Sequence, residues 1–316
     1  MFRLAFLGPR ATFTEQALRL LPDAEGAELL PQTTSTLALE AVRTGEADAA
    51  CVPIENSVEG GVPAVLDALV TDPPLVITRE VQLAVRFALL ARPGTVVTDI
   101  RTVASHPHGE AQTRHWLAAH LPKATVLMSS STAEAAAQVA RGEVDASVSA
   151  PVAASVHGLA VLADDIGDNA DAVTRFVLVR PPGPPPPPTA LDRTTLAATT
   201  ENRPGALLGI LTELAVRGID LTRIESRPIK GKRAEYWFHL DCTGHVAQPA
   251  MGEALAALHR RCLKVRYLGS YPRSSPPDGV DEPAGGAGAE PVSTVQEERF
   301  AAAAAWLAAV RAGTQA

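Results

Sequence analysis

Short apolar runs alternate with longer amphipathic stretches over the first 180 residues. The runs have the length of buried strands and lie at Leu4–Leu7, Ala49–Ile54, Val103–Ala104 and Ala146–Val148. Strands that alternate with helical stretches are typical of a mostly parallel sheet with crossover helices. Residues 1–180 are therefore predicted to form an α/β domain.

This domain also contains an internal echo. Residues 43–50 read RTGEADAA and residues 140–147 read ARGEVDAS, each with the pattern of a helix end, a glycine cap and a strand. Chance similarity in an alanine-rich chain is an alternative, because the match is short. A duplication would give two similar lobes, and ligands bind in the cleft of such folds, where strand ends and helix N-termini converge.

A second domain is predicted after a proline-rich run at residues 181–191. This run should form an extended linker, because proline lacks a backbone donor. Residues 192–272 show the β-α-β-β-α-β order of a ferredoxin-like domain. The expected strands are Thr194–Thr200, Asp220–Arg227, Glu235–Asp241 and Lys264–Leu268, and the expected helices are Gly205–Arg217 and Gly252–Arg261.

The end of the chain has a different character. Residues 273–291 are rich in Pro, Gly and Ser and are predicted to be disordered. Residues 292–313 return to a helical pattern, in which Phe300, Trp306 and Leu307 stand among alanines. The apolar side of this helix is expected to pack on another surface.

Composition and charge narrow the class of protein. The 316 residues are 46% hydrophobic and 20% charged, with a formal charge of -7 and no Lys/Arg-rich stripe, which argues against nucleic-acid binding. The start is unlike a signal peptide and no apolar run would span a membrane, so a cytoplasmic protein is expected. Cys51, Cys242 and Cys262 lack paired spacing and are interpreted as reduced thiols.

The first polar motif, GPRATFTEQA at residues 8–17, follows a predicted strand. Thr12 and Glu15 have the spacing of a capping box, which marks a helix N-terminus whose N–H groups suit a substrate carboxylate. An ordinary helix cap explains the same two residues.

The second motif, VPIENSVEG at residues 52–60, places polar side chains at the end of a buried strand. Asn56 can both donate to and accept from a ligand, and Ser57 is expected to cap the next helix. Glu55 is a candidate acid or base, although a structural hydrogen-bonding role fits it equally well.

The third motif, SHPHGEAQ at residues 105–112, leads from a strand into a helix. Ser105 is the predicted N-cap, Pro107 lies in the first turn, and Gln112 returns to the helix face that carries His108. Ser105 beside His106 does not make a nucleophile and its base, because adjacent side chains on one element do not face one another.

The histidines of this motif suggest a metal site only weakly. His106 and His108, with Glu110 or His115, would supply ligands, but no recognised zinc spacing occurs. No metal ion is therefore expected.

The fourth motif, DNADAVTRF at residues 168–176, runs into an apolar strand. Arg175 is a fixed cation that can grip a carboxylate through two hydrogen bonds. A surface salt bridge is the alternative for Arg175. Four polar motifs at strand ends of one domain favour a ligand site.

Together these segments resemble the prephenate dehydratase family, whose patterns read GPxGTFTEQA, VPIENSxxG, SHPQxxxQ and DNxxNxTRF. Residues 201–207, ENRPGAL, and residues 225–228, ESRP, are similar to the motifs of its ACT domain. The resemblance implies an α/β fold in which a bilobal catalytic domain, like a periplasmic binding protein, precedes a ferredoxin-like βαββαβ ACT domain.

The resemblance also implies an activity. Prephenate would become phenylpyruvate, water and carbon dioxide, without a cofactor or metal ion because aromatisation drives the reaction. Thr174 would act on the departing hydroxyl group, as a hydrogen-bond donor or proton relay because a threonine hydroxyl is a weak acid. The residues expected to bind or orient the substrate are Thr12, Asn56, Ser57, Ser105, Gln112, Arg175 and Phe176.

For the ACT domain, the resemblance implies an allosteric phenylalanine site and a homodimer or homotetramer. The expected site comprises Asn202, Gly205, Ala206 and Leu207 of one subunit and the segment Glu225, Ser226, Arg227 and Pro228 of another. A glycine at the helix start lets backbone N–H groups approach an amino-acid carboxylate closely.

The chain departs from the family patterns at three positions. Ala11 replaces a glycine, His108 replaces a glutamine and Ala172 replaces an asparagine. These changes put the hydrogen bonding near His108 in doubt but leave Thr174 in place. Arogenate dehydratase activity and a non-catalytic amino-acid-binding protein are the two alternative interpretations.

Overall fold

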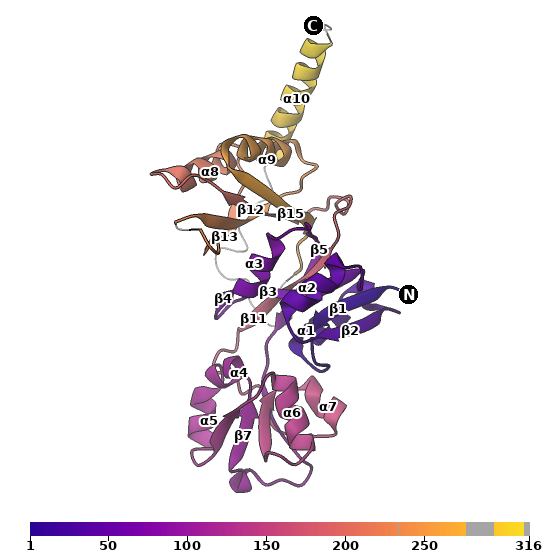
Figure 1. The fold of residues 1–316 in the computed structure, drawn as a ribbon, viewed down its shortest axis with the longest axis vertical. Helices are drawn as coiled ribbons and strands as arrows, with labels where there is room; N and C mark the ends of the chain where they lie inside the picture. The colour runs from indigo at the N-terminus through magenta and orange to yellow at the C-terminus, as the bar shows by residue number, and fades with distance from the viewer. Residues whose placement is uncertain (233, 276–293, 313–316) are drawn as a thin grey trace. The chain divides into compact units, whose positions relative to one another are not determined.

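The computed structural model describes residues 1–232, 234–275 and 294–312, and Figure 1 shows its ribbon. These residues fall into two compact units, and Ser275 is grouped with the first. The first comprises Met1–Val62 and Val81–Val177, and the second comprises Pro63–Glu80, Leu178–Ser274 and the last helix. Residues 63–80 thus belong with the C-terminal sheet, although the sequence places them within the first 180 residues.

The first lobe is built on a sheet with the strand order β2-β1-β3-β11-β5, and β4 pairs with β3. β1 is parallel to both β2 and β3. The strands are β1 (Arg3–Leu7), β2 (Glu28–Gln32), β3 (Ala49–Asn56), β4 (Gly60–Gly61), β5 (Val76–Ala84) and β11 (Val173–Arg180), and the helices are α1 (Phe13–Arg19) and α2 (Ser35–Arg43). The third helix, α3 (Pro63–Leu69), and the first half of β5 belong to the second unit.

The second lobe has a sheet with the order β10-β6-β9-β7-β8. Val103 packs with Leu117 of α5, and the next residue, Ala104, packs with Ala135 and Val139 of α6. Both faces of the sheet are therefore covered by helices (Figure 1). The strands are β6 (Ala88–Ala91), β7 (Thr102–Ser105), β8 (Thr125–Met128), β9 (Ala146–Ser149) and β10 (Ala160–Ala163), and the helices are α4 (Pro107–Ala111), α5 (Arg114–His120), α6 (Thr132–Ala140) and α7 (Val152–His157).

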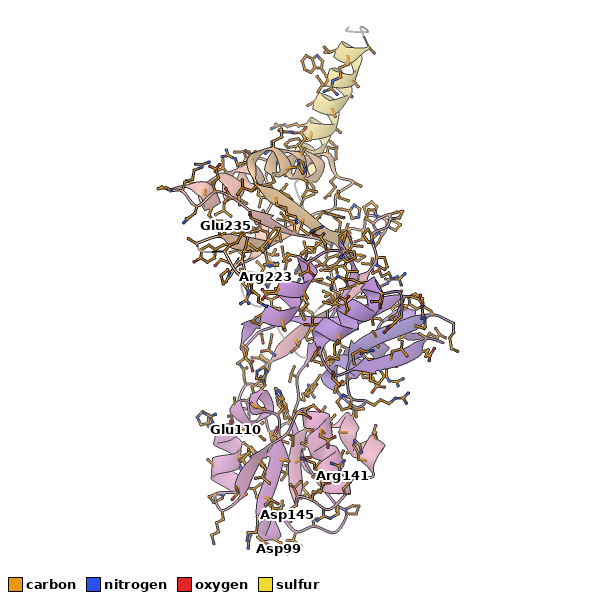
Figure 2. The ribbon with its side chains drawn as sticks, in the orientation of Figure 1. Asp99, Glu110, Arg141, Asp145, Arg223 and Glu235 are labelled. Carbon is orange, nitrogen blue, oxygen red and sulfur yellow. The ribbon has the colours of Figure 1, made fainter. Side chains whose placement is uncertain are left out.

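The echo seen in the sequence is a structural repeat. In each lobe a helix, α2 or α6, ends before a glycine with a φ of +77°, Gly45 or Gly142, and a strand follows. The aspartate of each copy also has the same role, which is to accept a backbone N–H group from a preceding segment of its own lobe. Asp48 accepts the N–H of Arg3 at 2.8 Å, and Asp145, labelled in Figure 2, accepts the N–H of Arg101 at 2.9 Å. These backbone hydrogen bonds lower the pKa of both carboxyl groups.

The second unit contains the predicted β-α-β-β-α-β order, with the strand order β13-β14-β12-β15. One face of this sheet packs on α8 and α9 through Leu196, Leu214, Leu240 and Leu258. The elements are β12 (Asp192–Thr199), α8 (Ala206–Ala215), β13 (Leu221–Pro228), β14 (Tyr236–Thr243), α9 (Pro249–Arg261) and β15 (Lys264–Pro272). Residues 181–191 form neither helix nor strand.

The other face of this sheet meets α3 and the first half of β5. Arg227 pairs with Asp67, Arg266 pairs with Asp72, and Glu80 pairs with Arg193. Gly269, with a φ of +138°, is required at this face, because a Cβ atom there would collide with the Ile77 backbone. Residues 63–80 are therefore held by the C-terminal sheet through charge pairs and a close backbone approach.

The C-terminal helix, α10, spans Thr294–Arg311. Phe300 packs against the core cluster beneath α8 and α9, as the sequence analysis expects of its apolar side. Trp306 is 61% exposed. Of the segment predicted to be disordered, residues 276–291 lie outside the described residues.

Candidate active site

Asn56 and Thr174 meet at the end of β3 and the start of β11. The Asn56 Nδ2 donates to the Thr174 Oγ1 at 2.8 Å. The Asn56 Oδ1 accepts the N–H groups of Val58 at 2.9 Å and Glu59 at 3.1 Å, which fixes the orientation of the amide. Because its oxygen accepts from Asn56, Thr174 keeps its own proton to donate elsewhere.

Ser57 clamps the residue that precedes Thr174. The Ser57 N–H donates to the Val173 carbonyl oxygen at 2.9 Å, and the Val173 N–H donates to the Ser57 Oγ at 3.0 Å. The expectation that Ser57 caps the next helix is wrong, since α3 begins only at Pro63. The hydroxyl group instead holds the backbone that carries Thr174.

Arg175 lies on the opposite face of the sheet from Thr174, because successive strand residues alternate. Its Nε lies 3.2 Å from the Glu55 Oε2, and the residue is 5% exposed. Glu55 contacts Arg175, Asn56 contacts Thr174, and Ser57 contacts Val173. The residue numbers rise along one segment and fall along the other, so the two segments run in opposite directions. Arg175 therefore braces these strands and does not point to the same place as Thr174.

Phe176 is a core residue in the structure. It is 2% exposed and ranks among the largest fully buried side chains. Phe176 therefore packs in the core, and its contact with the substrate stays a prediction.

Thr12 acts as a helix cap. Its Oγ1 accepts the Glu15 N–H at 3.3 Å and donates to the Leu7 carbonyl oxygen at 3.1 Å. The Glu15 carboxylate reaches the N–H of Ala11 at 2.7 Å. Ala11, at the family's glycine position, has a φ of +65° and packs against residues of the second lobe, including Ala88.

Ser105 is buried in the second lobe, and its Oγ donates to the Val148 carbonyl oxygen at 3.1 Å. The prediction that Ser105 caps the next helix is wrong. The N-cap is His106, whose Nδ1 accepts the His108 N–H at 3.2 Å. Gly109 permits this close packing, because a Cβ atom at Gly109 would lie 2.5 Å from the Ser105 Oγ.

Gln112 ends α4 and faces the first lobe. Its Nε2 donates to the Glu59 Oε1 at 3.0 Å, and the His108 Nδ1 lies 3.2 Å from the Glu59 Oε2. His108 and Gln112 thus share a helix face, as their spacing predicts. The Gln112 backbone is held by Asp168, whose N–H donates to the Gln112 carbonyl oxygen at 2.7 Å.

Asp168 also caps α5. Its carboxylate accepts the N–H groups of His115 at 2.9 Å and Trp116 at 3.1 Å. The fourth motif therefore has two roles. Asp168 fixes the backbone of Gln112 and the start of α5, and Thr174 provides the hydroxyl group that bonds to Asn56. Glu59 and the structural role of Asp168 were missed by sequence reasoning, since no local pattern reveals partners so distant along the chain.

A cavity of about 610 Å³ lies beside the turn that starts α8. Five of the eight residues expected to bind phenylalanine line it: Asn202, Gly205, Ala206, Leu207 and Ser226. Glu225 and Arg227 face the other side of β13, where they pair with Arg223 and Asp67, and Pro228 is exposed. Sequence reasoning missed Tyr236 and Phe238, which also line the cavity.

Burial shifts the pKa values of Cys51 and His106. Burial raises the pKa of Cys51 to about 12, as expected of an inert thiol. Burial also lowers the pKa of His106. Within residues 1–232, 234–275 and 294–312, no three His, Cys, Asp or Glu side chains are grouped to hold a metal ion, and no helix has the length and apolar character to cross a membrane.

Two α/β lobes, a hydroxyl–amide pair at a strand end and an attached ferredoxin-like domain define a ligand-binding enzyme fold with a second domain. Residues 4–183 match the prephenate dehydratase family model, and residues 194–260 match the ACT domain model. The chain therefore belongs to the prephenate dehydratase family.

Individual relatives agree with this assignment. The prephenate dehydratase of Amycolatopsis methanolica is 52% identical, covering 100% of both chains. The crystal structure of prephenate dehydratase in complex with L-Phe from Arthrobacter aurescens is 44% identical, with a TM-score of 0.85, covering 98% of this chain and 99% of that one. A structure of GqqA, described as a quorum-quenching acylase, is 32% identical, with a TM-score of 0.77, covering 86% of this chain and 98% of that one. The predicted fold class and the prediction of a lyase of phenylalanine biosynthesis are confirmed.

Proposed function

We propose that this enzyme converts prephenate, rather than arogenate, to phenylpyruvate, and that Thr174 assists the leaving group. The observation that carries the proposal is the hydrogen bond from Asn56 to Thr174. It occupies an acceptor position of the threonine oxygen and leaves the O–H proton for the substrate. A preorganised donor of this kind stabilises negative charge that develops in a transition state.

The reaction is a decarboxylative elimination. The bond between the ring and its carboxylate breaks, and the electron pair enters the ring as carbon dioxide leaves. The bond between the ring and the hydroxyl oxygen breaks, and the departing hydroxide takes a proton that comes from the solvent to become water. The Thr174 hydroxyl donates to this oxygen as charge develops on it. Aromatisation supplies the driving force, so these steps need no redox change.

Phenylalanine is the proposed ligand of the cavity beside α8, in a homodimer or homotetramer. Gly205, with a φ of +77°, lets the α8 N-terminus meet a carboxylate, and Leu207, Tyr236 and Phe238 supply apolar and aromatic surface. The L-Phe complex of the Arthrobacter aurescens relative supports this choice of ligand.

Two alternatives have less support. Acyl hydrolysis lacks an activated nucleophile at Ser105, whose hydroxyl group is buried against the Val148 carbonyl. A binding protein without catalysis does not explain the oriented Thr174 proton.

The deciding assay follows phenylpyruvate formed from prephenate by purified enzyme after chelator treatment, with arogenate in parallel and with phenylalanine added. We expect turnover of prephenate that survives the chelator and falls with phenylalanine. Faster turnover of arogenate would overturn the choice of substrate. Folded protein that acts on neither substrate would overturn the proposed activity.

A further inference from the structure

Glu59 of the first lobe makes polar contacts with two side chains of the second lobe. It lies in the turn between β3 and β4, and its two carboxylate oxygens contact the Gln112 Nε2 at 3.0 Å and the His108 Nδ1 at 3.2 Å. We propose that Glu59 is a positioning residue that orients the Gln112 amide and closes the second lobe onto the first. This inference rests on the proposed function.

The backbone of Glu59 is itself held by Asn56, which bonds to Thr174. Its N–H donates to the Asn56 Oδ1 at 3.1 Å, and the Asn56 Nδ2 donates to Thr174 at 2.8 Å. The adjacent Gly60 pairs with Asn56 as part of β4. A continuous series of hydrogen bonds therefore joins Thr174, Asn56, Glu59 and Gln112, and it spans both lobes.

The carboxylate determines which end of the Gln112 amide faces the first lobe. A carboxylate only accepts, so the NH₂ group must turn toward Glu59 and the Oε1 must turn away from it. The Gln112 Oε1 is buried and accepts no hydrogen bond from the residues that the structure describes. An oriented acceptor is thus left for a ligand.

Prephenate offers that acceptor one suitable donor. The dianion carries two carboxylates, a keto group and a single hydroxyl group, and the hydroxyl group is its only O–H. The Gln112 Oε1 accepts from this hydroxyl group while Thr174 donates to its oxygen. Glu59 thereby acts on the leaving group through Gln112, without touching the substrate.

The test compares wild-type enzyme, Glu59→Gln, Gln112→Ala and the double variant. The amide of a glutamine at position 59 can donate a hydrogen bond as well as accept one. The Gln112 amide can then rotate by 180° and exchange the places of its Oε1 and Nε2. We expect Glu59→Gln to lower kcat/KM roughly 10- to 100-fold, because small misplacements of a substrate-orienting group have effects of this size. We expect the same change to have little further effect in the Gln112→Ala background, since a residue that acts through another shows strong coupling.

The matched control is Glu40→Gln, which removes an exposed carboxylate that pairs with Arg43 on α2 and should leave turnover unchanged. His108→Ala should lower kcat/KM less than Glu59→Gln, because Gln112 keeps its partner. Losses that add in the double variant, or a Glu59→Gln enzyme with wild-type kinetics, would overturn the proposal. Failure of the wild-type enzyme to act on prephenate would instead count against the proposed function.

Discussion

Replacing Thr174 by valine tests the central feature of the site. Valine keeps the shape of threonine but lacks the hydroxyl group, so the sheet is retained while the donor is lost. Removal of one preorganised donor in an active site typically lowers kcat by roughly 100- to 1,000-fold, or about 2.7–4 kcal/mol of transition-state stabilisation. The Thr174→Val enzyme should show a loss of this size.

The effect on stability should be much smaller. The Asn56 Nδ2 loses its acceptor at Thr174, and an intramolecular hydrogen bond contributes about 1 kcal/mol to folding. Thr174→Ser keeps the hydroxyl group and should stay within roughly tenfold of wild type, less than the loss of a donor. Steady-state phenylpyruvate formation gives kcat, and thermal unfolding gives the stability.

Asn56→Asp keeps a hydrogen bond between residue 56 and Thr174 but reverses its direction. An ionised carboxylate cannot donate, so Thr174 would turn its proton toward residue 56 and away from the substrate. Asn56→Asp should therefore lose as much activity as Thr174→Val, although it keeps a polar partner of similar size. A Thr174→Val kcat within a few-fold of wild type, or an active Asn56→Asp enzyme, would refute this account of the site.

Three further predictions concern the second unit. Glu80→Ala leaves the buried Arg193 guanidinium without this partner and should lower the free energy of unfolding by about 3–5 kcal/mol, measured by denaturant titration. Burial lowers the pKa of His239 to about 4, so this histidine takes up a proton at a higher pH in the unfolded chain than in the folded one. The free energy of unfolding should therefore fall as the pH drops from the ordinary histidine range toward 4. His239→Phe should reduce this fall in a plot of the free energy of unfolding against pH. Asp67→Asn weakens the pairs with Arg227 and Lys230 and should raise the phenylalanine concentration needed for half-inhibition while basal turnover is retained; unchanged inhibition would contradict a role for this contact.

Much of the fold could be predicted because its signals are local. The repeat was visible because each copy needs a left-handed glycine after a helix and an aspartate that receives backbone N–H groups. The β-α-β-β-α-β order was equally visible from apolar periodicity. The grouping of residues 63–80 with the C-terminal sheet was not, because it depends on charge pairs between segments far apart in the chain.

The roles of the site residues were harder to predict. The resemblance named Asn56 and Thr174, and the structure brings them together. Ser57 bonds to Val173 and does not cap a helix, and Arg175 pairs with Glu55, since the pairing of β3 with β11 decides which side chains share a face. Carboxylate binding by Arg175 stays a prediction. Ser105 and Phe176 are buried, which sequence patterns did not reveal, and their contact with the substrate stays a prediction. Local sequence shows that a side chain is polar, whereas the fold decides what it meets.

Alternation along β13 explains how one motif can serve two purposes. Ser226 lines the cavity beside α8, and the next residue, Arg227, points to the other face and pairs with Asp67 on α3 at 3.1 Å. α3 follows closely in sequence after the motif that carries Asn56 and Ser57. A ligand that favoured another position of β13 would change the contacts of α3 without touching a catalytic group. Such a difference in contacts between two states is what allosteric coupling requires.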